Sequence, residues 1–238
     1  ISIGAPLPTP SLASNAIRAH NAHAVAERVR LDPPARDVVG FTRDGQRMIT
    51  DRDGGSCDIR RMPDGARIGS LEGAQSSSFG PVPISPDGQL LATGNQFVEG
   101  NIKLWSLDVG EQMREHRGGQ QVRDMAFAAE GHRLVAARSY GDVQVWDVAD
   151  GTLLANYRAP TGGYGGAVMA VHPGGDLVAT AANRGIAVDL RDVDSGEVIR
   201  TLTYSSTSTA TITRLLYRPD GDALLAATAS GIVLWEHD

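Results

Sequence analysis

The residues best suited to coordinating a metal are concentrated near the start of the chain. His20, His23 and Glu27 are spaced i, i+3 and i+7 in an Ala-rich stretch, which places them on one face of a helix. Imidazole nitrogens and carboxylate oxygens are ligands of zinc, but a closed structural site takes four of them. The sequence offers no fourth ligand, so we expect a solvated polar face and no metal centre.

Two glycine-containing segments share part of the pattern of ligand-binding loops. DRDGG (51–55) with Asp58 has the Asp-x-Asp-Gly start of a calcium loop, yet a complete set of oxygen ligands cannot be assembled around it. GGYGG (162–166) is not followed by the Lys-Ser/Thr pair and helix of a phosphate-binding loop. We therefore interpret the first as an ordinary turn and the second as a flexible loop, and expect no cofactor.

No catalytic set can be assembled from the sequence. The six histidines are scattered, with His132 beside a turn and His172 before a turn proline. A nucleophile, a base and a group that orients the base cannot be matched from their positions. We therefore expect that the chain is not an enzyme.

A fivefold internal repeat determines how all these residues are positioned. Each copy has a turn related to Pro-Asp-Gly followed by an apolar run, and the turn glycines are spaced by 43, 43, 44 and 46 residues. The copies are FTRDGQRMIT (41–50), ISPDGQLLAT (84–93), FAAEGHRLVA (127–136), VHPGGDLVAT (171–180) and YRPDGDALLA (217–226). A second landmark keeps the same phase and is occupied by Arg60, Trp105, Trp146, Arg191 and Trp235. A period of this length is typical of stacked or radial repeat architectures.

Each copy has the pattern of a small antiparallel sheet. In the third copy, VRDMAF (122–127), HRLVAA (132–137), DVQVWD (142–147) and TLLANY (152–157) are short and separated by Gly or Asp turns. Such strands predict a four-stranded meander, which has two faces to bury. Five meanders packed radially bury one another, so we predict an all-β propeller of five four-stranded antiparallel blades.

The repeat resembles the WD-repeat β-propellers over about residues 37–238. The resemblance rests on PDG before LLAT, on IKLW and VQVWD, and on the Trp146-Asp147 pair. The copies are degenerate, because Arg60 and Arg191 stand where the family has Trp. They resemble the bacterial members of the family. In blade three, Ala136 and Tyr140 stand where the family usually has Ser or Thr and Asp, so we expect its hydrogen-bonded tetrad to be missing there.

The two ends of the repeat region predict how the ring closes. The fifth copy stops after its third strand, and AERVRL (26–31) precedes the first copy as an alternating segment. We expect this segment to be the outer strand of the last blade, since closure removes unpaired strand edges. A larger ring is the alternative. The expected domains are a linker and short helix at 1–25 and a propeller at 26–238, with blades at about 37–72, 79–115, 122–157, 165–203 and 212–236 plus 26–31.

Composition narrows the classes of partner. A net charge of −6 argues against non-specific nucleic-acid binding, and no apolar run is long enough to cross a membrane. The single cysteine, Cys57, cannot form an internal disulfide, so the fold does not require an oxidising compartment and we expect a cytoplasmic protein. The Pro-rich segment and helix before residue 26 indicate a junction, and the resemblance implies a preceding catalytic domain such as a kinase or NTPase.

The resemblance also implies where a partner would bind. In the family, loops between second and third strands and loops between blades emerge on one face, which we call the loop face. Arginine and the aromatic residues are enriched at interface hot spots and gather on these loops. The candidate partner-binding residues are Arg52, Phe97, Arg138, Tyr140, Tyr164 and Arg184.

These features predict a non-catalytic protein–protein interaction module. We expect it to be the sensor or partner-binding domain of a larger protein, with a protein or peptide partner that the arginines suggest is acidic. The alternative is a propeller that binds a small molecule or glycan, or an enzyme with its site in the channel mouth. Paired carboxylates lining the channel would favour that alternative, and a shallow rim of Arg and Tyr would favour the first.

Overall fold

The computed structural model describes residues 31, 35, 37–52, 55–74, 82–94, 100–118, 120–159, 166–182, 186–204 and 212–236. The chain divides into two compact units, Ile1–Arg30 and Leu31–Asp238, and every described residue belongs to the second. The expected N-terminal helix, its possible metal ligands His20, His23 and Glu27, and nearly all of the expected closing strand 26–31 therefore lie outside the described residues.

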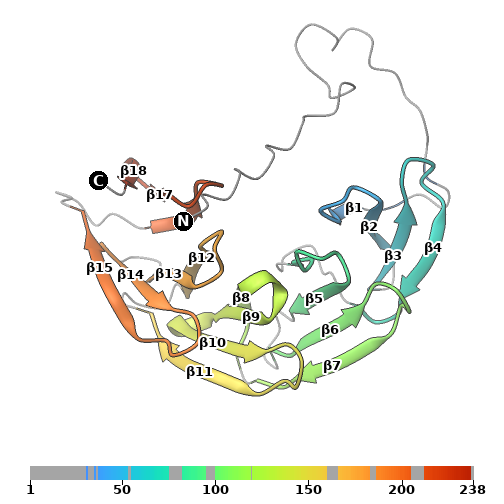
Figure 1. Cartoon of the computed structure of the whole chain (residues 1–238), viewed down its shortest axis with the longest axis horizontal. Helices are drawn as coiled ribbons and strands as arrows, with labels where there is room; N and C mark the ends of the chain where they lie inside the picture. The colour runs from blue at the N-terminus through green and yellow to red at the C-terminus, as the bar shows by residue number, and fades with distance from the viewer. Residues whose placement is uncertain are drawn as a thin grey trace, which may run out of the picture. The chain divides into compact units, whose positions relative to one another are not determined.

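The described part of the chain is all-β, which confirms the expected class of fold. Its strands form five antiparallel sheets that follow one another in chain order (Figure 1). The first sheet consists of β1 (Asp37–Phe41), β2 (Arg47–Arg52), β3 (Ser56–Arg61) and β4 (Arg67–Leu71). The second consists of β5 (Leu90–Gly94), β6 (Ile102–Ser106) and β7 (Gln112–His116).

The remaining sheets repeat this arrangement. The third consists of β8 (Val122–Ala128), β9 (Arg133–Arg138), β10 (Asp142–Asp147) and β11 (Leu153–Arg158), with short 3₁₀ turns η2 (Ala129–Gly131) and η3 (Ser139–Gly141). The fourth consists of β12 (Ala167–Val171), β13 (Leu177–Ala182), β14 (Ala187–Asp192) and β15 (Val198–Thr203). The fifth consists of β16 (Ile212–Tyr217), β17 (Ala223–Thr228) and β18 (Gly231–Glu236). No described helix is long and apolar enough to span a bilayer.

The second sheet departs from the four-stranded expectation because its innermost segment contains a proline. Pro83 has no N–H to donate to a ladder, and such residues are confined to sheet edges and strand ends. What remains is a single bridge from Ile84 to Leu91 and a bond from the Ala92 amide to the Pro83 carbonyl (3.0 Å). The described part of this sheet therefore has three strands and an innermost bridge.

Apolar side chains from neighbouring sheets form the core. One cluster joins the first and second sheets through Ile49, Ile59 and Leu91. Further clusters join the second to the third, the third to the fourth, and the fourth to the fifth. Trp105 and Trp146 belong to the first two of these clusters and are 3% and 6% exposed, as expected for tryptophans lying between blades.

Arg60 and Arg191, which stand in the tryptophan position of the third strand, both pair with acidic residues. A buried guanidinium group without such a partner would be energetically costly. Arg60 is fully buried, and its Nη2 lies 3.3 Å from Asp58 Oδ2. Its Nε donates to Thr50 Oγ1 (3.1 Å), just as Trp105 Nε1 donates to Thr93 Oγ1 (3.0 Å). Arg191 pairs with Asp189 at 2.7 Å. In the first sheet, arginine thus keeps the tryptophan's hydrogen bond to the second strand.

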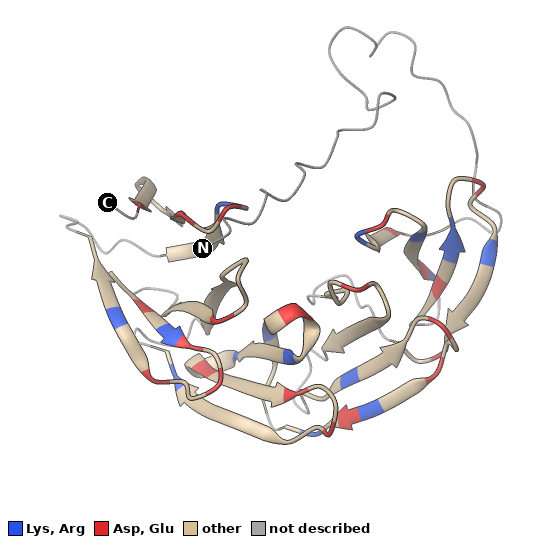
Figure 2. Ribbon diagram, in the orientation of Figure 1, with Lys and Arg blue, Asp and Glu red and all other residues tan. Residues whose placement is uncertain are grey.

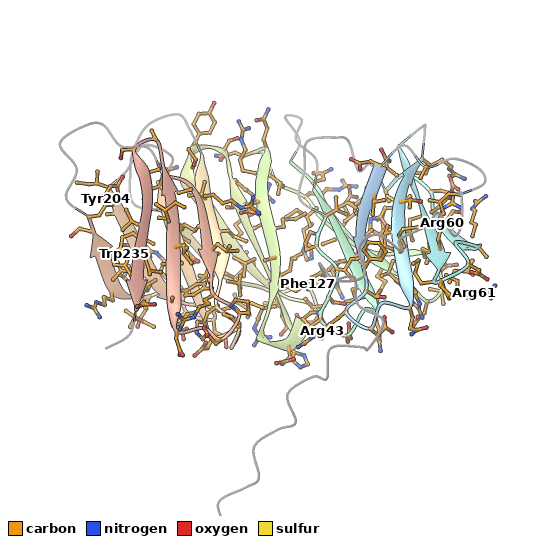
Figure 3. The ribbon with its side chains drawn as sticks, turned by 90° about the horizontal axis from the view of Figure 1, so that it is seen from above. Arg43, Arg60, Arg61, Phe127, Tyr204 and Trp235 are labelled. Carbon is orange, nitrogen blue, oxygen red and sulfur yellow. The ribbon has the colours of Figure 1, made fainter. Side chains whose placement is uncertain are left out.

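Trp235 differs from the expectation that it lies buried between blades. It is half-buried, packs against the cluster of the fourth and fifth sheets, and meets Tyr204 edge-on with ring centroids 6.4 Å apart (Figure 3). On the other side of β18, Ile232 and Leu234 are 72% and 51% exposed. Among the described residues, no apolar cluster joins the fifth sheet to the first.

Candidate functional site

The structure places Arg138, expected as an exposed contact on the loop face, in the interior. Its side chain is only 2% exposed, and burial lowers the pKa of the guanidinium. Nη1 donates to the carbonyls of Gly100 (2.6 Å) and Gln120 (2.7 Å), and Nε donates to Gln144 Oε1 (2.6 Å). Arg138 therefore ties the second sheet to the third, and the expectation of a solvent-facing guanidinium at this position is corrected.

Two glycines make room for this buried side chain, and sequence reasoning did not find them. A Cβ on Gly118 would lie 2.6 Å from Arg138 Nη2, and a Cβ on Gly100 would lie 2.8 Å from Nη1. Gly100 also has φ of +51°, a left-handed conformation that favours glycine. The ring of Trp146 lies beside the guanidinium, 5.7 Å from its centre. Both glycines lie in segments distant from Arg138 along the chain, so no local sequence pattern indicated its burial.

Arg52 is only partly accessible and already has partners. Its Nη2 donates to Glu72 Oε1 at 2.5 Å, and its Nη1 lies 3.6 Å from Asp58 Oδ1. The hydrogen bond from Arg52 lowers the pKa of the Glu72 carboxyl. Asp58 also receives Arg67 Nε at 3.1 Å. Because Asp58 is surrounded by guanidinium groups, it is not placed as a calcium ligand. Asp53 and Gly54 of the DRDGG segment lie outside the described residues.

Tyr140 is the candidate residue that the structure leaves most open. Its side chain is 56% exposed, and it lies in the η3 turn with φ of +66° and ψ of +10°. A left-handed conformation is uncommon for a residue with a side chain and is found preferentially at functional sites. The neighbouring Arg138 fixes the chain immediately before this turn. Phe97, Tyr164 and Arg184, the other candidates, lie outside the described residues.

The described residues carry no sign of a metal centre. They contain no group of three or more His, Cys, Asp or Glu side chains able to hold an ion. Acidic and basic residues are interspersed along the strands and turns of the described sheets (Figure 2). Many of the described charges form ion pairs, such as Arg133 with Asp147 and Arg191 with Asp189.

Antiparallel sheets that repeat every 43 to 46 residues, with a tryptophan or arginine at one position of the third strand, are typical of WD-repeat propellers. Residues 110–147 match the family model "WD domain, G-beta repeat", so this segment is a WD40 repeat. The crystal structure of the Myceliophteria_thermophila Cps50 (Swd1) beta-propeller domain is similar in fold, with a TM-score of 0.68. It is 18% identical, and the match covers 90% of this chain and 67% of that one.

Curated relatives match shorter stretches. Telomerase protein component 1 of Rattus norvegicus is 34% identical over 111 residues, which is 46% of this chain and 4% of the relative. Eukaryotic translation initiation factor 3 subunit I of Scheffersomyces stipitis is 31% identical over 98 residues, 41% of this chain and 27% of the relative. The chain therefore spans less than a third of either protein. Both relatives are eukaryotic, so they give no support to the expected bacterial character.

These comparisons support the expected class of function. The relatives are named as a protein component and as a subunit, and the structural neighbour is a propeller domain. They are consistent with a non-catalytic interaction module and with the expectation that the chain is not an enzyme.

Proposed function

We propose that this chain is a non-catalytic docking module that contributes to a multi-component protein assembly and holds its partner on the loop face. The observation that carries the proposal is the exposed Tyr140 ring on a left-handed turn. Tyrosine gives a large contact area for little loss of side-chain entropy, and it is enriched among interface hot spots. The WD40 repeat at 110–147 contains this turn.

The structure also bears on the partner's chemistry. Arg52 is the other described candidate of this face, and an acidic partner would have to compete with Glu72 for its guanidinium. Such an exchange costs little, because the Arg52–Glu72 pair is partly exposed and exposed ion pairs contribute about 0–1 kcal/mol. We therefore propose a protein or peptide segment with an acidic residue placed beside an apolar or aromatic one.

The alternative of an enzyme or glycan-binding propeller gains no support. One pocket among the described residues, formed by turns of four sheets, is lined by a single carboxylate, that of Glu130, whereas glycoside hydrolysis uses two. The comparisons likewise point to interaction domains.

Affinity capture with quantitative mass spectrometry tests the proposal. Wild-type chain, Tyr140→Ser and Met113→Ser are compared as baits, because Met113 is a similarly exposed residue (63%) on the outer strand β7. Partners that bind the loop face should be depleted on Tyr140→Ser about tenfold, as expected for a hot spot of about 1.4 kcal/mol or more. They should remain on Met113→Ser. Equal recovery on all three baits would place the interaction elsewhere.

We further propose that a catalytic domain belongs to the same full-length protein. We also propose that residues 26–31 pair with β18 as the outer strand of the fifth sheet and so close a ring of five blades. The support for closure is the alternating AERVRL segment together with a fifth sheet that ends at β18 in its described part. Deletion of residues 26–31, followed through the fluorescence of Trp235, tests this pairing.

A further inference from the structure

A hollow lies where the innermost strands turn into the second strands of the sheets, at the other ends of these strands from the loop face. This turn pocket has a volume of about 270 Å³ and draws on turns from four consecutive sheets. It is lined by Arg43, Pro86, Ala126, Phe127, Ala128, Ala129, Glu130, Val171, His172, Pro173 and Gly175. Figure 3 labels Arg43 and Phe127 and shows both toward the same end of the sheets.

Three turn residues that line the pocket, Arg43, Ala129 and Glu130, depart from the chain's own repeat. In three of the other four turns, proline stands at the position of Arg43, and in three of them aspartate stands at the position of Glu130. Ala129 occupies the proline position of the third copy, and Gly174 beside Gly175 occupies the aspartate position of the fourth.

The carboxylate of Glu130 is left unused by its turn. In the Pro-Asp-Gly turns the aspartate accepts hydrogen bonds within the turn, as Asp87 does from the Ser85 hydroxyl (2.5 Å) and the Gln89 amide (3.0 Å). Glu130 is exposed and has no partner in the described contacts. Its turn closes instead with a bond from the His132 amide to the Ala129 carbonyl (2.9 Å).

This turn is also strained and fixed in place. Ala129 and Glu130 have φ of +47° and +55°, two consecutive left-handed residues that are not glycine. Such conformations persist only where the surroundings enforce them, and they cluster at functional sites. Here the Ala129 amide donates to the Gly175 carbonyl (3.1 Å), which holds the third turn against the fourth and forms one wall of the pocket.

The turn pocket carries one positive and one negative side chain, Arg43 and Glu130, on a partly apolar surface. Arg43 is exposed on the β1–β2 turn and, like Glu130, has no partner in the described contacts. Phe127 and Val171 are partly buried and give the pocket apolar surface. Guanidinium binds carboxylate through paired hydrogen bonds, carboxylate binds ammonium, and an apolar surface takes an aliphatic group.

We propose that the turn pocket binds a short ampholytic peptide segment of a partner protein. One aliphatic side chain of the segment enters against Phe127, an acidic residue pairs with Arg43, and a basic residue pairs with Glu130. This site is separate from the loop face, so it provides the docking module with a second point of attachment.

The test is a titration of the whole chain with three capped pentapeptides. Binding is measured from the NMR chemical-shift changes of the backbone amides of Ala129, Gly131 and Gly175. The probe is Ala-Glu-Leu-Lys-Ala, and the matched peptides replace Glu and Lys with Gln, or Leu with Ala. The probe should shift these amides with a Kd of about 1 mM or tighter, and each matched peptide should bind several-fold more weakly. Shifts that are absent, or equal for all three peptides, would overturn the proposal.

Substitutions in the pocket test which charge of the peptide pairs with Arg43 and which pairs with Glu130. Arg43→Gln and Glu130→Gln should each weaken the probe about fivefold, the ratio expected for one exposed ion pair. Glu130→Arg should transfer the preference to a peptide with Glu in place of Lys. Arg200→Gln is the matched control, because Arg200 is exposed on β15, outside the pocket, and has no partner in the described contacts. An equal loss in Arg200→Gln would show that net charge alone determines binding.

Two further variants distinguish a binding role from a structural one, and the turn pocket from the loop face. Glu130→Gly should raise the melting temperature, because glycine adopts φ of +55° without strain, while it still weakens the probe. A merely structural role for Glu130 predicts that stability and binding fall together. Tyr140→Ser should leave probe binding unchanged, so failure at the turn pocket and failure at the loop face are distinguishable.

Discussion

At the residue scale, the third-strand position shows how one structural role is filled by two kinds of side chain. Trp105 and Arg60 each donate to a threonine on the second strand, at 3.0 Å and 3.1 Å. Tryptophan satisfies its single N–H in this way and fills the space between sheets with its ring. Arginine has five donors, so it also needs the Asp58 carboxylate and the Gly65 carbonyl.

Trp146 gives the most direct test of packing at this position. Its ring is 6% exposed and lies beside His116, with ring centroids 5.1 Å apart, and beside the Arg138 guanidinium. Trp146→Ala should lower the free energy of unfolding by about 3–5 kcal/mol, because the cavity is large and Arg138 loses its cover. Met113→Ala, at a residue 63% exposed, should change it by less than about 0.5 kcal/mol. Chemical denaturation midpoints that move equally in both variants would contradict the interior position of Trp146.

The sequence predicts tryptophan burial better than it predicts arginine burial. Trp105 and Trp146 recur in phase and are apolar, so their position between sheets follows from the repeat. Arg138 has the sequence environment of an exposed loop residue. Its burial depends on carbonyls of Gly100 and Gln120, which come from segments far from it along the chain. Tertiary hydrogen bonds of this kind leave no periodic signal in a single sequence.

At the element scale, the outer strands share a bulge that the sequence pattern does not reveal. In β4, β7, β11 and β15 the register shifts beside the third-strand tryptophan or arginine, so one residue of each outer strand is unpaired. These residues are Ile68, Met113, Leu154 and Ile199, between 39% and 63% exposed. Bulges twist an edge away from further pairing, which protects sheets whose outer strands are unpaired on one side.

The innermost strand β8 also has a bulge, which lies next to the partly buried carboxylate of Asp124. The register skips Arg123, and the Asp124 side chain accepts the Met125 amide at 2.9 Å. Burial raises the pKa of Asp124 from 3.8 to about 6, with the Met125 and Met169 amides and Arg214 opposing the rise. Asp124 is therefore a partly buried acid between β8 and its neighbour β12.

This shift predicts that the contribution of Asp124 to stability falls as pH rises, opposite in sign to the contribution of carboxyls whose pKa is lowered, such as Glu72. Between pH 4 and pH 6 the folded state holds a proton on Asp124 that the unfolded state has lost, so each rise in pH favours unfolding. Asp124→Asn should remove this decline and stabilise the chain at pH 7 by about 1–3 kcal/mol, since the amide keeps the hydrogen-bond acceptor without the buried charge. Thermal unfolding of both proteins across this range measures the effect. Parallel pH profiles would show that Asp124 has an ordinary pKa.

At the scale of the whole molecule, the repeat predicted the five sheets and their order, because period and turn glycines are local signals. The sequence did not predict that the innermost segment of the second sheet forms only a bridge in its described part, although Pro83 explains it. It also did not predict the turn pocket, because a hollow formed by turns from four sheets depends on how the sheets pack.

The first and fifth sheets each leave apolar side chains exposed on the side that no other described sheet covers. Val38 and Phe41 of the first sheet are 48% and 53% exposed, and Ile232 and Leu234 of the fifth are 72% and 51% exposed. In the four sheets with a described outer strand, the first residue of that strand pairs with the third-strand tryptophan or arginine, as Leu153 does with Trp146. If residues 26–31 are the missing outer strand, they should cover Trp235 in the same way.

Trp235 can report on this pairing as a single fluorophore. With Trp105 and Trp146 replaced by Phe, deletion of 26–31 should shift the emission of Trp235 to longer wavelength and increase its quenching by acrylamide several-fold, because a half-buried indole loses its neighbouring strand. The unpaired edge of β18 should also promote association, visible as a larger species in size-exclusion chromatography. Deletion of the Pro-rich segment 5–10 is the matched control and should leave emission, quenching and size unchanged. An emission and a size that do not respond to loss of 26–31 would contradict closure by this strand and favour the larger ring, in which further sheets cover both exposed ends.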